Sequence, residues 1–241
     1  MMGTRQHLGA ALGFCVCAQL ACALTFVTED YPPFNMQVDG EVSGIATELL
    51  AQALQRAGLQ ASFELMPWAR ALFLARSQPD TCVYSAVRTA ERERFYRWIG
   101  PLVADEIKLF ARADNPLRLN SAADASKFRV GGYNGDAYSD LAEKMGIPLE
   151  RAASDVQNLL KLRAGRIDLW VAGSRVGPYR ARLAGFQNGI KPVLTLASGK
   201  DTQMWLACNP QLGGATFDRL NAAVQAVLKA GELERISARY R

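Results

Sequence analysis

Residues 98–114 read WIGPLVADEIKLFARAD, and this stretch decides how the rest of the chain is organised. Proline lacks a backbone donor and biases the residue before it toward extended backbone, so the pair Gly100–Pro101 favours an extended chain here. The segment separates two groups of alternating strand-like and helix-like stretches. It therefore predicts a strand that leaves one lobe of the protein and enters another.

Before this segment, from Leu24 onward, short apolar stretches alternate with amphipathic stretches of helix length. The order strand, helix, strand, helix, strand is typical of α/β domains with parallel strands. A charged stretch at 89–97, TAERERFYR, is expected to be helical and closes the group. The expected strands are LTFVT (24–28), ASFELM (61–66) and TCVYSAV (81–87), and the expected helices are SGIATELLAQALQRAG (43–58) and PWARALFLARSQ (67–78).

A second group of the same kind follows the segment. The chain then ends in two helices that break at Gly231, where the helical pattern is interrupted. The expected strands of this part are 129–133, 149–153, 166–173, 191–197 and 202–209, and the expected helices are 121–128, 136–146, 155–165, 175–185 and 216–241.

The loops at the carboxyl ends of the strands hold the unusual clusters of this sequence, and in open α/β sheets ligands bind at those ends. The loop TEDYPPFN at 28–35 crowds two acids and an aromatic against a double proline, which makes it rigid. Rigid loops hold ligands or serve as ordinary turns, and this stretch alone leaves both interpretations open. The loops concerned are 28–35, 66–70, 85–92, 133–138 and 172–176.

The first 23 residues have the pattern of a secretory signal peptide. Arg5 precedes an apolar run over 8–22, and small residues lead to a cleavage point after Ala23. The run is too short for a membrane-spanning helix. A lipid-bearing first residue at Cys22 is the less favoured alternative, because Gln19 stands where a branched apolar residue is needed. The mature chain is expected to be a soluble protein exported to the periplasm.

The composition of the mature chain excludes several classes of function. His7 is the only histidine and leaves with the signal peptide, so catalytic schemes that need a histidine base are excluded and no metal site or cofactor is predicted. The formal net charge falls from +5 to +4 with the loss of Arg5, and no basic run remains, so no nucleic-acid partner is predicted. Cys82 and Cys208 remain and are able to form one disulfide in an oxidising compartment.

A set of motifs runs through the whole mature chain, and their order and spacing carry more weight than any single one. Together they resemble the periplasmic solute-binding proteins of the polar amino acid (family 3) type, and within it the subgroup marked by PWAR and SxxRTxxR. The motifs are EDYPPFN (29–35), GIATELL (44–50), PWARA (67–71), SAVRTAERE (85–93), WIGP (98–101), LRAGRIDLW (162–170) and KAGELERI (229–236).

The resemblance implies a two-lobed α/β fold, the periplasmic-binding-protein type II fold, with two crossing strands and hinge closure on a small molecule. Lobe 1 is expected to comprise 24–103 and 198–241, and lobe 2 is expected to comprise 104–197. In that architecture the strand after the second crossing pairs antiparallel with the third strand of lobe 1. This implies that Cys82 and Cys208 meet at the end away from the ligand and form a disulfide, with two buried free thiols as the alternative.

The resemblance also assigns roles to residues. Arg92 matches an arginine that grips the ligand carboxylate, which suits the planar fork of its guanidinium, although a solvated charged helix is the alternative. Ser85 matches a position that contacts the ligand, and Tyr31 matches an aromatic that stacks over it. The remaining candidates for ligand binding lie in the same loops, and they are Glu29, Trp68, Arg70, Arg88, Tyr133, Asp136 and Arg175.

One position departs from the family pattern. Typical amino acid binders carry an aspartate five residues beyond the aspartate of GRID, where it pairs with the ligand's ammonium, and this chain has Gly173 there. An unpaired buried ammonium would weaken binding. Either Asp136 or Glu29 replaces that aspartate, or the ligand is not an α-amino acid. The collected arginines 70, 88, 92 and 175 favour an anionic ligand.

The expected function is that of a monomeric, non-enzymatic solute-binding protein. It captures a small polar or anionic metabolite, an amino acid or organic acid, for the membrane permease of an ABC importer. One alternative is a partner that presents its ligand to a membrane sensor. Another is a cyclohexadienyl dehydratase-like enzyme on the same scaffold, with Glu29 or Asp136 as a general acid.

Overall fold

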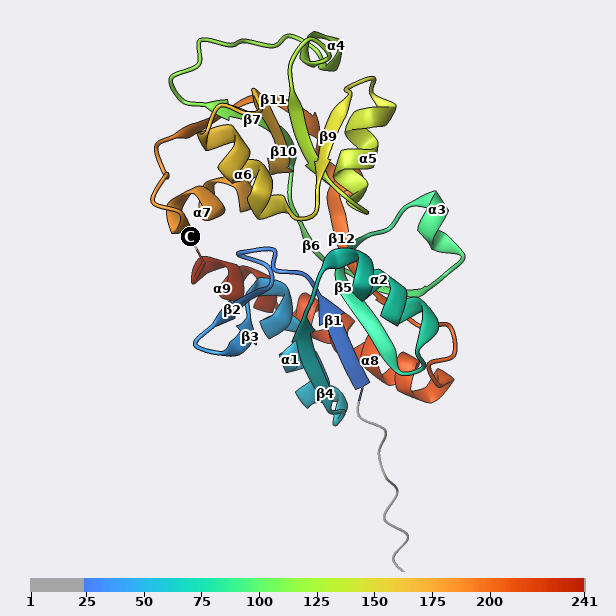
Figure 1. Cartoon of the computed structure of the whole chain (residues 1–241). Helices are drawn as coiled ribbons and strands as arrows, with labels where there is room; N and C mark the ends of the chain where they lie inside the picture. Colours follow the sequence, from blue (N-terminus) through green and yellow to red (C-terminus); the bar gives the residue numbers. More distant parts are fainter. Residues whose placement is uncertain (1–23, 241) are drawn as a thin grey trace, which may run out of the picture.

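The computed structural model describes residues 24–240, which form two lobes joined by extended segments (Figure 1). Each lobe is built on a five-stranded mixed sheet covered by helices. The expected fold class, a two-lobed periplasmic-binding-protein type II fold, is confirmed. The predicted signal peptide, residues 1–23, lies outside the described residues.

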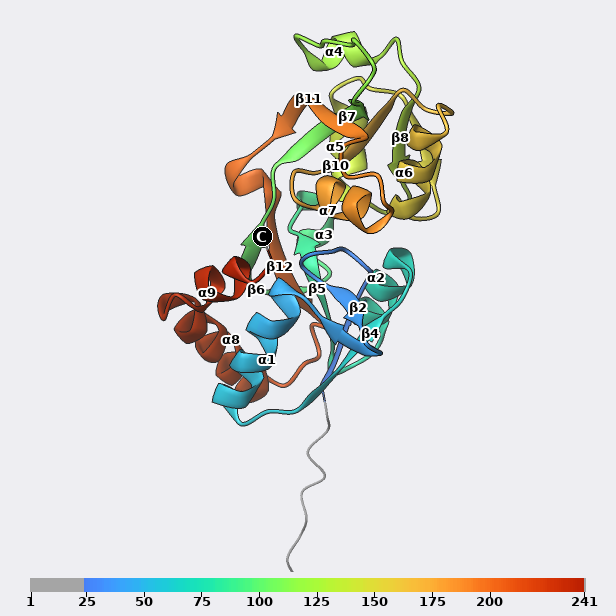
Figure 2. The same cartoon turned by 90° about the vertical axis from the view of Figure 1, so that its left-hand side faces the viewer.

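The sheet of lobe 1 has the strand order β4-β1-β5-β12-β6. Its first three strands are parallel, and β12 runs antiparallel to both of its neighbours. Helices α1, α8 and α9 cover one face of this sheet and α2 covers the other (Figure 2). The elements are β1 (Leu24–Thr28), α1 (Ile45–Ala57), β4 (Ala61–Leu65), α2 (Trp68–Ser77), β5 (Thr81–Val87), α3 (Ala90–Glu93), β6 (Arg97–Ala104), β12 (Gln203–Cys208), α8 (Gly214–Lys229) and α9 (Glu232–Ala238).

The sheet of lobe 2 has the strand order β11-β7-β10-β8-β9. Strand β10 carries the fully buried Trp170, which packs with α6 and α7 on one face, while α5 packs on the other. The elements are β7 (Ile107–Arg112), α4 (Ala122–Ala125), β8 (Val130–Tyr133), α5 (Ala137–Lys144), β9 (Leu149–Ala152), α6 (Asp155–Arg163), β10 (Leu169–Gly173), α7 (Val176–Leu183) and β11 (Ile190–Ala197).

Two segments carry the chain between the lobes (Figure 2). The first runs from β6 into β7, and the second runs from β11 through the 3₁₀ helix η1 (Gly199–Thr202) into β12. Gly100 in β6 has a φ of +138°, and a Cβ there would lie 2.9 Å from Leu102 N and 3.2 Å from the Trp205 ring. Glycine is therefore required for this crossing strand to pack against β12.

The structure corrects one local expectation and adds one element that was not predicted. The charged stretch 89–97 is helical only over Ala90–Glu93, because the chain then turns to bury Tyr96, whose hydroxyl donates to Leu72 O at 2.8 Å, and enters β6. A short hairpin, β2 (Met36–Val38) and β3 (Glu41–Ser43), follows the proline-rich loop and was not expected.

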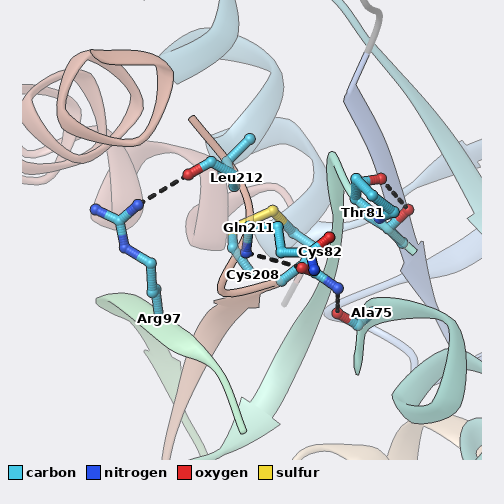
Figure 3. The surroundings of a disulfide bond; sticks show 9 residues. Ala75, Thr81, Cys82, Arg97, Cys208, Gln211 and Leu212 are labelled. Atoms are coloured by element: carbon cyan, nitrogen blue, oxygen red, sulfur yellow. Dashed lines mark hydrogen bonds between the residues drawn. A yellow bond between two sulfur atoms is a disulfide. The ribbon is translucent and has the colours of Figure 1, made fainter. Parts of the chain in front are cut away.

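The predicted disulfide is confirmed. Strands β5 and β12 pair antiparallel with Cys82 opposite Cys208, and their sulfur atoms are bonded (Figure 3). Their Cα atoms lie 3.9 Å apart, and 126 residues separate them in sequence. The bond lies where β5 begins and β12 ends, whereas the candidate site described below lies at the other end of β5. It therefore ties the returning chain into the sheet of lobe 1.

Candidate functional site

Side chains from both lobes enclose a cavity of about 20 Å³ between them. The walls come from the carboxyl ends of β1, β5 and β8 and from the starts of α2 and α5, as expected for a sheet of this type. A space of this size holds about one water molecule, so it is too small for a metabolite in this arrangement of the lobes. The lining residues are Thr28, Glu29, Tyr31, Asn35, Trp68, Ser85, Val87, Arg92, Tyr133, Asp136, Ala137, Tyr138 and Met204.

The loop 28–35 is fastened to β5 through Asn35. Its Nδ2 donates to Thr28 Oγ1 at 2.9 Å and to Glu29 O at 2.6 Å, while its Oδ1 accepts a bond from Ser85 Oγ at 2.5 Å. Ser85 has a φ of +58°, an uncommon backbone conformation for a residue other than glycine. These contacts fix the loop, and with it Glu29 and Tyr31, against the strand that leads to Arg92.

Arg92 lies in the short helix α3 and reaches both lobes. Its Nη1 donates to Val87 O at 3.0 Å, and its Nη2 donates to Gly135 O of lobe 2 at 2.8 Å. Trp68 Nε1 donates to the same Gly135 oxygen at 2.9 Å, and the guanidinium carbon lies 5.7 Å from the Trp68 ring centre. Two donors of lobe 1 therefore converge on one oxygen atom of lobe 2.

The cavity holds two carboxylic acids, and the side chain of Glu29 has one hydrogen-bond partner, a tyrosine hydroxyl. Tyr133 OH donates to its Oε1 at 2.9 Å. Enclosure between the lobes raises the pKa of Glu29 from 4.5 to about 8, with a further contribution from the negative charge of Asp136. The group therefore keeps its proton at neutral pH unless a positive charge comes close to it.

Asp136 is occupied by its own helix. As the N-cap of α5, it accepts bonds from the backbone of Tyr138 at 3.2 Å and of Ser139 at 2.8 Å, and from Ser139 Oγ at 2.7 Å. Burial raises its pKa to about 6, although the Ser139 bonds oppose that shift. With both carboxylate oxygens already paired, Asp136 is less available to a ligand than Glu29.

The structure brings only one of the four collected arginines to the cavity. Arg70 is exposed on α2. Arg88 pairs with Glu93 through two bonds of 2.7 and 2.5 Å near the surface, and it lines a neighbouring groove instead. The Arg175 guanidinium lies 5.4 Å from the centre of the Phe34 ring. Of the four arginines only Arg92 lines the cavity, so the expectation of an anionic ligand is not supported by a cluster and stays a prediction.

The missing aspartate at position 173 has a steric explanation. A Cβ on Gly173 would lie 2.2 Å from Oδ2 of Asp105 and 3.1 Å from the Tyr31 hydroxyl. Asp105, in the first crossing segment, is 3% exposed and accepts bonds from Ser174 Oγ at 2.6 Å and from the Arg175 backbone at 3.1 Å. The carboxylate of Asp105 thus fills the space that a side chain at 173 would enter.

Residues 24–128 match the bacterial extracellular solute-binding proteins, family 3. That range holds the strands β1 to β7, and with them the loops that supply Glu29, Trp68 and Arg92. No curated protein sequence matches the chain.

Solved structures extend the likeness to both lobes. An ancestral arginine-binding protein bound to arginine is 19% identical, with a TM-score of 0.78 over 90% of this chain and 97% of that chain. A histidine kinase sensor domain with similarity to periplasmic binding proteins is 22% identical, with a TM-score of 0.79 over 91% and 96%. An ancestral amino acid-binding protein, a precursor of cyclohexadienyl dehydratase, is 16% identical, with a TM-score of 0.75 over 90% and 94%. At these identities the likeness shows the fold.

The geometry of the cavity also includes lining residues that sequence reasoning missed. Asn35 ends the quoted loop TEDYPPFN, and Tyr138 follows the N-cap Asp136 by two residues, so each stood beside a residue already singled out. Tyr138 OH donates to Thr202 O at 3.3 Å, which links α5 to the second crossing segment.

Two features are absent from the described residues 24–240. No group of three or more histidine, cysteine, aspartate or glutamate side chains is arranged there to hold a metal ion. Within the same range, none of the helices is long and apolar enough to cross a membrane.

Proposed function

We propose that the chain is a family 3 solute-binding protein that captures a small amino acid between its lobes for ABC-type import. The observation that carries this is that the Arg92 guanidinium and the Glu29 carboxyl line the same cavity. A free amino acid presents one carboxylate and one ammonium, and these two side chains supply one partner for each.

Binding of the ligand's carboxylate is supported by the two side-chain donors that meet at Gly135 O. When the lobes separate, Arg92 Nη2 and Trp68 Nε1 lose this acceptor and keep their mutual arrangement on lobe 1. A carboxylate oxygen at the same point accepts both bonds. Charge-assisted bonds from a guanidinium are stronger than bonds between neutral groups, so this end anchors the ligand.

Binding of the ligand's ammonium is supported by the second carboxyl oxygen of Glu29, which is available to accept a bond. Its Oε1 accepts the Tyr133 bond, and its Oε2 has no hydrogen-bond partner among residues 24–240. A bound ammonium stabilises the ionised carboxyl and lowers its raised pKa, so binding of the amine and loss of the Glu29 proton go together. Glu29 would thereby replace the aspartate that Gly173 and Asp105 leave no room for.

The proposal includes the compartment and the partner. A disulfide between Cys82 and Cys208 persists in an oxidising compartment such as the periplasm. The description of family 3 as extracellular agrees with export through the amino-terminal signal peptide. The partner is then the membrane permease of an ABC importer, and the protein acts as a monomer.

Thermal unfolding of the mature protein, residues 24–241, tests this function directly. A ligand present at 100 times its dissociation constant adds about 2.7 kcal/mol to the free energy of unfolding, which shifts the melting temperature by several degrees. We expect such a shift with at least one amino acid. If no amino acid raises the melting temperature while an organic acid without an amine does, the ligand class is wrong.

A second candidate function, in a different class, follows from the protonated state of Glu29. A carboxylic acid with a pKa of about 8 in the same cavity as a guanidinium is suited to general acid catalysis, and one structural relative is a precursor of cyclohexadienyl dehydratase. Turnover of arogenate or prephenate that is lost in Glu29→Gln would establish this function. The binding proposal predicts no turnover by either protein.

A further inference from the structure

A buried arginine joins the two lobes beside the candidate site. Arg180 lies in α7 of lobe 2 and is 6% exposed. Its Nε donates to Oδ2 of Asp155, the first residue of α6, at 3.1 Å. Asp155 is 2% exposed and accepts a second bond, of 2.8 Å, from Trp170 Nε1. Asp155, itself fixed by Trp170, therefore orients the guanidinium within lobe 2.

The rest of the guanidinium points to lobe 1. Nη1 donates to Oδ2 of Asp30 at 3.0 Å, and Nη2 donates to the carbonyl oxygen of the same residue. Asp30 follows Glu29 in the rigid loop 28–35. Its side chain is 51% exposed, so it becomes fully hydrated when the lobes part. The bond to Asp155 lies within lobe 2, whereas the bonds to Asp30 join the two lobes and must break if the lobes part.

Arg180 and its two acidic partners line part of a groove of about 500 Å³, open to solvent, next to the cavity. Glu29, Asp30, Asp155 and Arg180 all line this groove. A guanidinium with unpaired N–H groups is costly in the closed cleft and well hydrated in an open one. Removing the Asp30 carboxylate takes away the bond from Nη1 and the opposite charge, while the bond from Nη2 to the main-chain oxygen remains, so it weakens the closed arrangement relative to the open one.

We propose that Arg180 is a positioning residue, which sets the balance between open and closed lobes through its ion pair with Asp30. It does not line the cavity that is proposed to hold the ligand. By holding the Asp30 backbone it also keeps the neighbouring Glu29 carboxyl against Tyr133. The inference rests on the proposed function in one respect, that closure accompanies binding. Ligand affinity then scales with the fraction of molecules that are able to close.

A distance measurement between the lobes tests the proposal without any ligand. Ala69 on α2 and Leu160 on α6 are exposed, and Ala69→Cys with Leu160→Cys provides two spin-label sites in the mature protein. The other cysteines of the mature chain are the disulfide pair, so labelling is specific. In Asp30→Ala, pulsed electron paramagnetic resonance is expected to show the ratio of short to long distances falling at least tenfold.

A matched control is provided by a second ion pair that crosses the lobes. Lys144 Nζ lies 2.6 Å from Glu91 Oε1, but the two side chains are 63% and 65% exposed. Exposed pairs contribute little, so Lys144→Met should leave the distance distribution unchanged. The proposal is overturned if Asp30→Ala does not change the distribution, or if Lys144→Met changes it as much.

Substitution of Arg180 tests the proposed role in lobe closure independently. Arg180→Met is expected to open the lobes as Asp30→Ala does, but it also leaves Asp155 buried without its charged partner. Asp30→Ala keeps the bond between Arg180 and Asp155, so its result does not depend on whether Arg180→Met folds. Opening in Arg180→Met together with no change in Asp30→Ala would assign the effect to lobe 2 and contradict the proposal.

Ligand titration separates this inference from the proposed function. With the amino acid that gives the largest thermal shift as the probe, Asp30→Ala should raise the dissociation constant by about the factor by which the closed fraction falls. If no amino acid binds the parent protein, the proposed function fails. The spin-label distances still decide the role of Arg180 in that case.

Discussion

Arg92 donates to main-chain carbonyls of both lobes, and the planar fork of its guanidinium is what allows this. A lysine at this position keeps the charge but presents it as a single point. We predict that Arg92→Lys raises the dissociation constant for the amino acid ligand at least tenfold, which corresponds to about 1.4 kcal/mol. Arg94→Lys, an exposed position two residues on, is the control and should change it little. Calorimetric titration of both variants gives the answer.

Glu29 makes stability depend on pH, and the sign follows from its raised pKa. Between pH 4.5 and about 8 the native protein keeps a proton that the unfolded chain has lost, so the free energy of unfolding falls as pH rises through this window and levels off above it. Asp136 acts in the same direction between pH 3.8 and about 6.

We therefore predict that Glu29→Gln is more stable than the parent at pH 8, by about 2 kcal/mol, and similar to it at pH 5. The value is smaller than the full pKa difference implies because the lobes can part and hydrate the carboxyl. Urea unfolding at both pH values measures it. A parent protein whose stability rises between pH 5 and pH 8 would contradict the assigned pKa.

Seven of the ten candidate ligand-binding residues line the cavity. The sequence could place these seven but not the direction of the other three side chains. Strand ends and the loop 28–35 converge by topology, so residues such as Glu29 and Ser85 are placed by chain order alone. The side chains of Arg70, Arg88 and Arg175 are long, and their direction depends on neighbours such as Glu93 and Phe34 that no sequence pattern identifies.

At the scale of single elements, β12 is the strand that returns to lobe 1 from far along the chain. The disulfide fixes it to β5, and the bonded residues are 126 apart, so the bond restricts the unfolded chain strongly. We predict that the double variant Cys82→Ala with Cys208→Ala loses about 3–5 kcal/mol of stability. This corresponds to a melting temperature lower by roughly 10 °C.

Reduction of the parent protein should give the same loss, and reduction of the double variant should have no effect. Thiol counting on unreduced, denatured protein should find no free thiol in the mature chain. Two free thiols would show that the bond does not form.

Strand β10 ends at Gly173, where a side chain has no room. Gly173→Ala places a Cβ against the Asp105 carboxylate, which is held by Ser174 and the start of α7. We predict a loss of about 2 kcal/mol of stability, with ligand affinity reduced as the crossing segment shifts. Gly185→Ala is not a suitable control because of its positive φ, whereas Gly214→Ala has open space at its Cβ and should be neutral. Denaturant unfolding compares the two.

Two elements differ from sequence expectation for opposite reasons. The hairpin of β2 and β3 turns at Asp39–Gly40, a pair that favours such turns, and both residues have positive φ, so a signal was present in the sequence. The early end of α3 had no such signal. Its cause is the burial of Tyr96 against α2, which is a tertiary contact.

At the scale of the whole molecule, the Gly100–Pro101 segment and the alternating pattern predicted two groups of α/β elements, and the resemblance to family 3 implied their class of fold. They were not enough to predict how the lobes meet. Arg180 and Asp30 are 150 positions apart, and their contact depends on the angle between two lobes that fold around separate sheets. The fold could therefore be predicted more completely than the cleft.

One measurement tests the central claim, that Arg92 and Glu29 together select an amino acid. The mature protein is titrated by calorimetry with the amino acid chosen by thermal shift and with the matching carboxylic acid that lacks its amino group. We predict that loss of the amine weakens binding at least tenfold, about 1.4 kcal/mol, because Glu29 is left without its charged partner. Equal or tighter binding of the acid without the amine would contradict the account and assign the site to organic acids.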